Sequence, residues 1–290
     1  PDVDCSRAHD ARVSRSQASP EAHLISVRWL PDLPPWLARA RAAPRSDQSG
    51  HAAWASTSMS PTLILVLRAA AVPMLTEVSE YKGQRAIAVS CTQLGTEFTS
   101  SRARRVVEEW IELLSSRTPL TDLEFTTRTP KRLFAALAGQ PQLTRLVVKW
   151  GDYADLSPLR SMSGLRHLEL RGASAVTDVG PVAELHNLRL LALEGFRTIE
   201  DPSPLATVHR LTDLEIGGAW MSPRNGHIAT IGFLRELQDL EKVLLHTVVV
   251  DDLDYSPLLD LPKLRSVRAM KVRGMRPEHD ELRRRLPWKA

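Results

Sequence analysis

The stretch LRHLEL at residues 165–170 returns as LRLLAL at 188–193 and as LTDLEI at 211–216. The same frame, L-x-x-L-x-L with apolar substitutes, begins at seven leucines: Leu120, Leu143, Leu165, Leu188, Leu211, Leu240 and Leu264. These first leucines are 23, 22, 23, 23, 29 and 24 residues apart. A fixed period in the twenties indicates a solenoid, in which each repeat buries its apolar side chains against the next. The sequence therefore predicts an elongated core with a broad exposed surface.

A proline-bearing phrase follows most of the predicted strands by about ten residues. It reads DLSPL at 155–159, DVGPV at 178–182 and DPSPL at 201–205, and it is stretched over 252–258 with Asp252 as its acid. Proline suits the first turn of a short helix, and an acidic residue before it complements the helix dipole. The apolar residues that we expect to point inward after it are Leu159, Met162, Val182, Leu185, Leu205, Val208, Leu258 and Leu261.

The leucine frame and the proline phrase together resemble the short repeat class of bacterial internalins and of phosphatase-regulating leucine-rich proteins. The resemblance implies an α/β fold, a leucine-rich-repeat solenoid with a curved parallel β-sheet on the concave side. Short helices or 3-10 turns would cover the convex side, with caps at both ends. One column departs from that class, which carries a buried asparagine where this chain has Arg128, Gly151, Ala173, Phe196, Ala219, Val248 and Val272. We expect the extra residue of the 23-residue repeats to satisfy the backbone groups there.

The pattern divides the chain into four segments: a poorly ordered extension at 1–73, an N-terminal cap at 74–118, the repeats at 119–273 and a C-terminal cap helix at 274–290. The N-terminal cap is predicted to hold a strand at 85–90 and a helix capped by Ser100 or Ser101. The apolar face of that helix comprises Val106, Val107, Trp110, Ile111 and Leu114. The extension has no period, and we expect that it need not be translated, with Met59 or Met74 as candidate starts.

Composition excludes several classes of protein. The two cysteines, Cys5 and Cys91, form neither a disulfide framework nor a metal-binding spacing, which favours a reducing cytoplasm. The aliphatic run Leu63–Leu67 is too short to span a bilayer, and Pro61–Leu75 would be a poor signal sequence with Arg68 in its middle. Phosphate-loop, dinucleotide-binding, zinc-protease and serine-hydrolase motifs are absent from the sequence. We therefore expect no enzyme, no cofactor and no metal.

The concave face is where the sequence predicts binding. In each L-x-L strand the leucines point inward, so the residues between and beside them face outward. On that face Asp122, Glu169, Glu194, Asp213 and Glu215 are acidic, whereas Arg145, Lys149, His167 and Arg171 form a basic island. Exposed Trp and Arg are frequent binding hot spots. The predicted partner-binding residues are Arg145, Lys149, Trp150, His167, Glu169, Arg171, Glu194, Glu215, Trp220 and His246. An ordinary solvated strand face is the simpler alternative.

Two other features are candidate sites. The 29-residue repeat carries its excess in the glycine-rich loop 217–227, and insertions in repeat arrays often make contacts. From Pro262 to Ala290 there are ten Lys and Arg against three Asp and Glu.

We expect a monomeric scaffold or regulatory subunit whose partner is another protein, without nucleic acid or membrane. The alternative is binding of nucleic acid or an acidic surface through the basic C-terminal cap. A third possibility is an unrecognised enzyme, or a fragment whose catalytic domain lies elsewhere.

Overall fold

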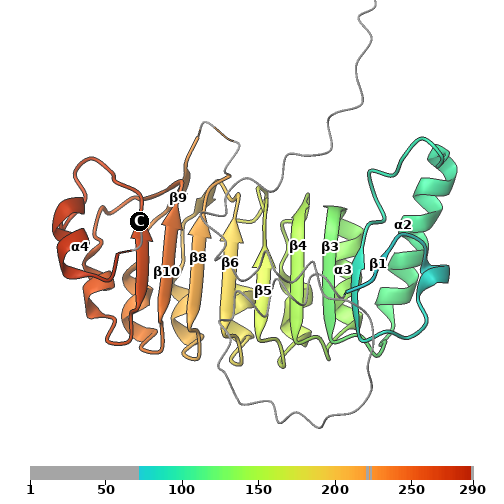
Figure 1. The fold of residues 1–290 in the computed structure, drawn as a ribbon, viewed down its shortest axis with the longest axis horizontal. Coiled ribbons are helices and arrows are strands. Elements are labelled where there is room, and N and C mark those ends of the chain that lie inside the picture. The colour runs from blue at the N-terminus through green and yellow to red at the C-terminus, as the bar shows by residue number, and fades with distance from the viewer. Residues whose placement is uncertain (1–71, 220–221, 223, 289–290) are drawn as a thin grey trace, which may run out of the picture. The chain divides into compact units, whose positions relative to one another are not determined.

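The computed structural model describes residues 72–219, 222 and 224–288 of the 290-residue chain. Nine parallel strands form one sheet in these residues, in the order β1-β2-β3-β4-β5-β6-β8-β10-β12 (Figure 1). The strands are β1 (Met74–Leu75), β2 (Ala86–Val89), β3 (Asp122–Thr129), β4 (Arg145–Gly151), β5 (His167–Leu170), β6 (Leu190–Glu194), β8 (Asp213–Gly217), β10 (Lys242–His246) and β12 (Ser266–Ala269). Each repeat adds one strand beside the last, so the predicted leucine-rich-repeat solenoid is confirmed. All but the last two residues of the predicted extension 1–73 lie outside the described residues, as does Trp220.

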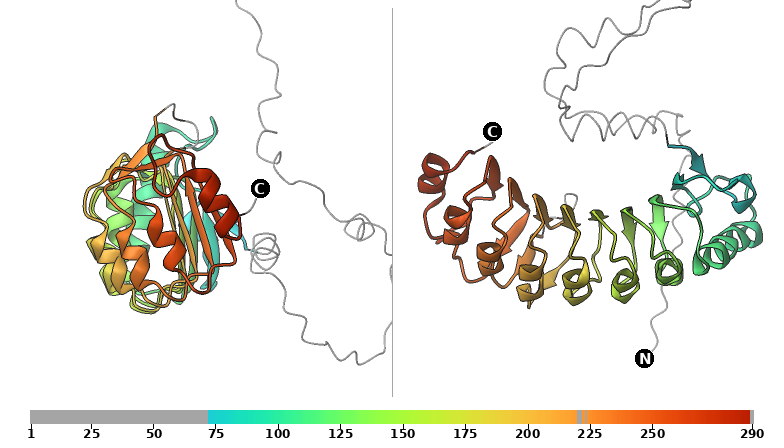
Figure 2. Two further views of the ribbon diagram at one scale, coloured as in Figure 1. Left: turned by 90° about the vertical axis from the view of Figure 1, so that its left-hand side faces the viewer. Right: turned by 90° about the horizontal axis from the view of Figure 1, so that it is seen from below.

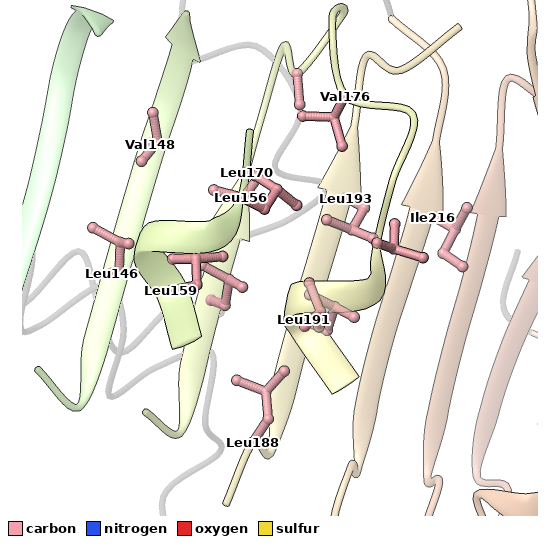
Figure 3. Packing of buried hydrophobic residues seen from close by; sticks show 14 of the residues in the cluster. Leu146, Val148, Leu156, Leu159, Leu170, Val176, Leu188, Leu191, Leu193 and Ile216 are labelled. Atoms are coloured by element: carbon pink, nitrogen blue, oxygen red, sulfur yellow. The ribbon is translucent and has the colours of Figure 1, made fainter. Parts of the chain in front are cut away.

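The leucines of the frame stack in one register along the solenoid. Leu146 pairs with Leu168, and Leu168 pairs in turn with Leu191 on the next strand. These side chains are fully buried, and Figure 3 shows Leu146 and Leu191 in the same layer of buried side chains as Leu156 and Leu159. Burial of one such side chain contributes about 1.5–3 kcal/mol. The core is therefore a continuous column of leucine that runs through successive repeats.

Short 3-10 turns cover the outer side of the curved sheet (Figure 2). They are η4 (Ser157–Ser161), η5 (Gly180–Glu184), η6 (Ser203–Thr207), η7 (Gly232–Glu236) and η8 (Ser256–Asp260). The proline of the repeated phrase is the second residue of η4, η5, η6 and η8, within the first turn as predicted. The acid before each of these four turns accepts a backbone N–H, as where Asp155 Oδ1 lies 2.8 Å from the Ser157 nitrogen. In the stretched phrase this acid is Asp254, 2.9 Å from the Ser256 nitrogen, rather than the predicted Asp252.

A second parallel sheet joins the segments that follow three of the concave strands by backbone hydrogen bonds. Its strands are β7 (Thr198–Ile199), β9 (Gly226–Ile228) and β11 (Val248–Val250), in the order β11-β9-β7. Backbone hydrogen bonds satisfy these turns, such as His227 N–H to the Arg197 carbonyl at 2.8 Å. In an earlier turn the Ala173 N–H donates to the Glu194 carbonyl at 2.8 Å. Main-chain pairing thus does what a buried asparagine column does in the class that the sequence resembles.

Each cap contains a helix, and the C-terminal one covers only part of the predicted segment 274–290. The N-terminal helix α2 (Ser100–Ser115) buries Val106, Trp110 and Leu114, and its cap is Thr99 rather than Ser100 or Ser101. Thr99 Oγ1 accepts the Arg102 N–H, so the helix begins one residue earlier than a Ser100 cap predicts and two earlier than a Ser101 cap. The first repeat carries a further helix, α3 (Lys131–Ala136), and the closing helix is α4 (His279–Arg285). Two shorter 3-10 turns, η2 (Val78–Glu80) and η3 (Leu137–Gly139), complete the described elements. Among the helices of the described ranges, none is both long and apolar enough to cross a bilayer.

Candidate functional site

The concave face of the sheet carries the side chains that the alternation of the strands assigns to it. Several of them are far less exposed than an open strand face would leave them, because neighbouring side chains pair across the strands. Glu169 and Glu194 are 6% and 5% exposed, and His246 is 6% exposed. Buried carboxylates need partners, since an unpaired charge away from water is costly. The pairs therefore determine what this face can bind.

Arg145 on β4 is paired with two acids of the neighbouring strand β3. Its guanidinium lies 2.8 Å from Asp122 Oδ1 and 3.2 Å from Glu124 Oε2. Burial by itself would lower the pKa of Arg145, but the hydrogen bonds and charges of these two acids raise it above its usual value. The Arg145 side chain is only 16% exposed. It is therefore a structural cation whose charge is already neutralised.

Arg171, just after β5, lies among three carboxylates from three strands. Its Nη2 is 2.7 Å from Glu169 Oε2 and 3.6 Å from Glu215 Oε2. Its Nη1 makes an ion-pair contact with Glu194, although not with the geometry of a hydrogen bond. The Arg171 side chain remains 38% exposed, so a ligand can reach one side of it. This cluster links β5, β6 and β8 across the concave face.

Glu169 also contacts His167 of its own strand, with Nε2 and Oε1 2.5 Å apart. Burial raises the pKa of Glu169, but the hydrogen bond from His167 and the charge of Arg171 outweigh it. Together with the charge of His167 they bring this pKa down to about 2. Glu169 is therefore ionised at every pH near neutrality. It holds both His167 and Arg171 in fixed positions.

His246 on β10 has its imidazole over the backbone of the neighbouring strand β8. Its Nε2 lies 3.1 Å from Glu215 Oε1, and its Nδ1 lies 3.1 Å from Thr247 Oγ1. The ring fits there because residue 217, its partner in register on β8, is a glycine. Potential ligand atoms of Glu194, Glu215 and His246 lie within 4.8 Å of one another. Because Arg171 already contacts Glu194, a metal ion at this place would have to displace its guanidinium.

A depression of about 420 Å³ lies beside this cluster, over strands β5, β6, β8, β10 and β12. Half-buried Leu190 and Leu244 line it together with Arg171, Glu215 and Lys242. Lys242 is 2.6 Å from Asp213 Oδ1, so most of the charges around the depression are held by opposite charges. An apolar floor with a charged rim is typical of the centre of a protein interface.

The structure separates the remaining candidates from this cluster. Lys149 and Trp150 lie near the end of β4, where Trp150 is 37% exposed. Trp220 and part of the loop 217–227 lie outside the described residues. The basic island proposed from sequence is not a free positive patch, because Arg145 and Arg171 are neutralised by acids on neighbouring strands. A one-dimensional count of like charges could not show this.

Several residues of this face were not among the predicted binding residues. They are Asp122, Glu124, Leu190, Asp213, Lys242 and Leu244. The repeat register contains the missing signal, because residues in the same column of successive repeats are direct neighbours. Asp122 pairs with Arg145, and Asp213 pairs with Lys242, in the strand register. Opposite charges directly across adjacent strands predict an ion pair.

Comparison with known proteins finds solved structures that are similar to parts of this chain. No family model matches it, and no curated protein matches it. An internalin (InlF) of Listeria monocytogenes is 24% identical over 63% of this chain, with a TM-score of 0.44, and the chain spans only 47% of that protein. Internalin C2 of the same bacterium is 22% identical over 61% of this chain and 81% of its own, with a TM-score of 0.35. A leucine-rich-repeat protein of Leptospira interrogans is 14% identical over 71% of this chain and 57% of its own, with a TM-score of 0.40.

The class of this chain follows from its own sheet, turns and period. It is a leucine-rich-repeat solenoid with a helix at each end. These likenesses to solved structures concern the fold and carry no assignment of a partner.

Proposed function

We propose that this chain is a non-enzymatic, monomeric protein-binding module of the cytoplasm, a scaffold or regulatory subunit, which holds its partner on the concave face. The observation that carries the proposal is the depression lined by Leu190 and Leu244 beside the Arg171 cluster. Its apolar floor offers area for burial, and the surrounding ion pairs offer directional contacts. Because Glu169 and Glu194 already hold Arg171, little side-chain freedom would be lost when a partner binds.

A site-specific photocrosslinker tests this proposal. We would place a benzophenone amino acid at Leu190 in the full chain and irradiate it in lysate of the source cell. The matched control carries the same group at His186, which is exposed in the turn that precedes β6. We expect a discrete protein adduct from position 190 that is absent from position 186. The same adducts from both positions, or none from position 190, would contradict binding on the concave face.

A second variant tests the contribution of the depression itself. Leu244→Lys puts a long cationic side chain into the depression without touching the buried leucines, because residue 244 faces outward. We expect it to remove the adduct formed at position 190 while the far-UV circular dichroism stays unchanged. His186→Lys is the charge-matched control and should leave the adduct intact. An adduct that survives Leu244→Lys would place the contact outside the depression.

The alternative function, binding of nucleic acid or an acidic surface, concerns the C-terminal cap. Arg283 and Arg284 of α4 are exposed and have no ion-pair partner among the described residues, whereas Arg285 pairs with Glu281. Binding of this kind falls steeply with salt concentration. Material that is retained by the chain and released by nuclease or by added salt would favour this alternative over a protein partner.

A further inference from the structure

A second pocket lies at the C-terminal end of the concave face, between β10, β12 and the cap helix α4. Its volume is about 520 Å³. It is lined by three cations, Arg268 of β12, Arg283 of α4 and Lys271 from the segment between them. His279 and Trp288 also line it. None of the described residues that line it is an aspartate or a glutamate. With neutral histidines the lining carries three positive charges and no negative one.

This imbalance sets the pocket apart from the rest of the concave face. Arg145, Arg171 and Lys242 each have a carboxylate within 3 Å or less. The side chains of Arg268 and Arg283 make no ion pair or hydrogen bond within residues 72–219, 222 and 224–288, and only their backbones are bonded, in β12 and α4. Lys271 has only a loose contact of 3.9 Å with Asp280, and both of those side chains are largely exposed. The positive charges that line this pocket are therefore left without a close negative partner among the described residues.

Backbone contacts fix the wall of the pocket. The Pro287 carbonyl accepts the Val267 N–H at 3.1 Å, which joins the end of the described chain to β12. Trp288, next along the chain, packs edge-on against His279 with ring centroids 5.0 Å apart. His279 is itself only 13% exposed in its side chain. Three rings, of His246, His279 and Trp288, and three cations thus line a single recess. The segment that carries Trp288 is held in place by its backbone bond to β12.

We propose that this pocket receives a phosphate monoester carried by a side chain of the partner protein. A dianionic phosphate has three acceptor oxygens and can accept hydrogen bonds from several cations at once. Guanidinium groups match that geometry with paired N–H donors, and Arg268 and Arg283 approach the recess from two different elements. The neighbouring rings suit the apolar carbons that connect a phosphate to its chain. The proposal rests on the proposed function, because it specifies the chemistry of the same partner.

The test uses small probes and the full 290-residue chain. We would titrate it with phenyl phosphate, benzoate and phenol, and follow the indole N–H resonance of Trp288, assigned with Trp288→Phe. We expect saturable shifts with phenyl phosphate, weaker binding of benzoate and no binding of phenol. Arg268→Ala and Arg283→Ala should each weaken phenyl phosphate about tenfold, the loss expected for one charge-assisted hydrogen bond. Arg284→Ala on the same helix is the matched control, because Arg284 does not line the pocket, and it should change the affinity by less than about twofold.

Each contrary outcome overturns the proposal in a distinct way. Phenol binding as tightly as phenyl phosphate would leave only a ring-binding recess. Benzoate binding as tightly would replace phosphate by carboxylate. A loss with Arg284→Ala equal to that with Arg268→Ala would show general attraction to a basic end, and the absence of any shift would show no site. The titration needs no partner, so its failure leaves the crosslinking test of the concave face unaffected.

Discussion

Gly217→Ala tests whether a glycine on β8 makes the place in which the imidazole of His246 lies. A Cβ at residue 217 would lie 2.2 Å from Cε1 and 2.3 Å from Nε2 of His246. Carbon atoms in contact are separated by about 3.5–4.0 Å, so the ring must leave. It then loses its 3.1 Å contacts with Glu215 and Thr247.

The magnitude follows from three contributions. Overpacking of a buried site costs about 1–3 kcal/mol, and a lost hydrogen bond costs about 0.5–1.5 kcal/mol. Replacement of a strand glycine by alanine offsets about 0.5–1 kcal/mol of this. We therefore expect Gly217→Ala to lower the free energy of unfolding by about 1–3 kcal/mol. In a His246→Ala background the obstacle is gone, and the same change should be neutral or stabilising by about 0.5–1 kcal/mol.

Urea unfolding of the four chains of this double-mutant cycle, followed by far-UV circular dichroism, measures the coupling. The matched control is Gly164→Ala, because a Cβ there meets only one atom, the Leu143 carbonyl oxygen at 4.0 Å. That control should not destabilise the chain. Equal losses from Gly217→Ala with and without His246 would refute the reasoning, since the imidazole would then not be what the new methyl group meets.

Three further predictions use the same unfolding assay. Arg171→Met leaves the buried carboxylates of Glu169 and Glu194 without their guanidinium. We expect the free energy of unfolding at pH 7 to fall by about 2–4 kcal/mol, toward the lower end because Arg171 is partly exposed. A fall below about 0.5 kcal/mol would mean that solvent replaces the ion pair. The pKa of Glu169 is lowered from 4.5 to about 2 in the folded chain, so its stabilisation, on the order of 3 kcal/mol, is complete above pH 4.5 and is lost as the pH falls toward 2. Glu169→Gln should flatten the fall in stability over that range, and unchanged slopes would contradict the assignment. Trp110→Phe removes an indole N–H that donates to the Thr76 carbonyl at 2.8 Å from a fully buried side chain. We expect the free energy of unfolding to fall by about 1–3 kcal/mol, because the carbonyl loses its donor. An unchanged free energy of unfolding would contradict a stabilising role for this hydrogen bond.

The repeats could be predicted from sequence because each one carries the same spacing of apolar residues. Leu168 and Leu191 occupy identical places in the frame, and burial of leucine is a strong, non-directional force that tolerates small errors of geometry. The turns were predictable for a related reason, since Pro158 and Asp155 act on the backbone within a few residues. These are local effects, and local effects are visible in a single chain.

The candidate site was only partly predictable because it depends on neighbours that are one repeat away. Arg145 and Arg171 were recognised as outward-facing, but their acids lie on adjacent strands and cancel the charge that sequence assigned to them. The run Val248–Val250 was not expected as a strand, because its pairing partner β9 belongs to an irregular loop. The C-terminal pocket needs Trp288 and Arg268 together, and only the docking of the last residues against β12 brings them close.

The second sheet, β7-β9-β11, has a mechanical consequence. Repeats in a solenoid of this kind contact only their neighbours, through one hydrogen-bonded sheet (one seam) and the leucine core, so small changes between repeats can change the curvature of the whole array. Here the repeats that contain β6, β8 and β10 are hydrogen-bonded along two seams, the concave sheet and the sheet β7-β9-β11. Two parallel seams resist both twisting and changes of curvature. We therefore expect the half of the concave face that holds Leu244 to change its curvature less than the half near Arg145, where the described residues contain no strand of the second sheet.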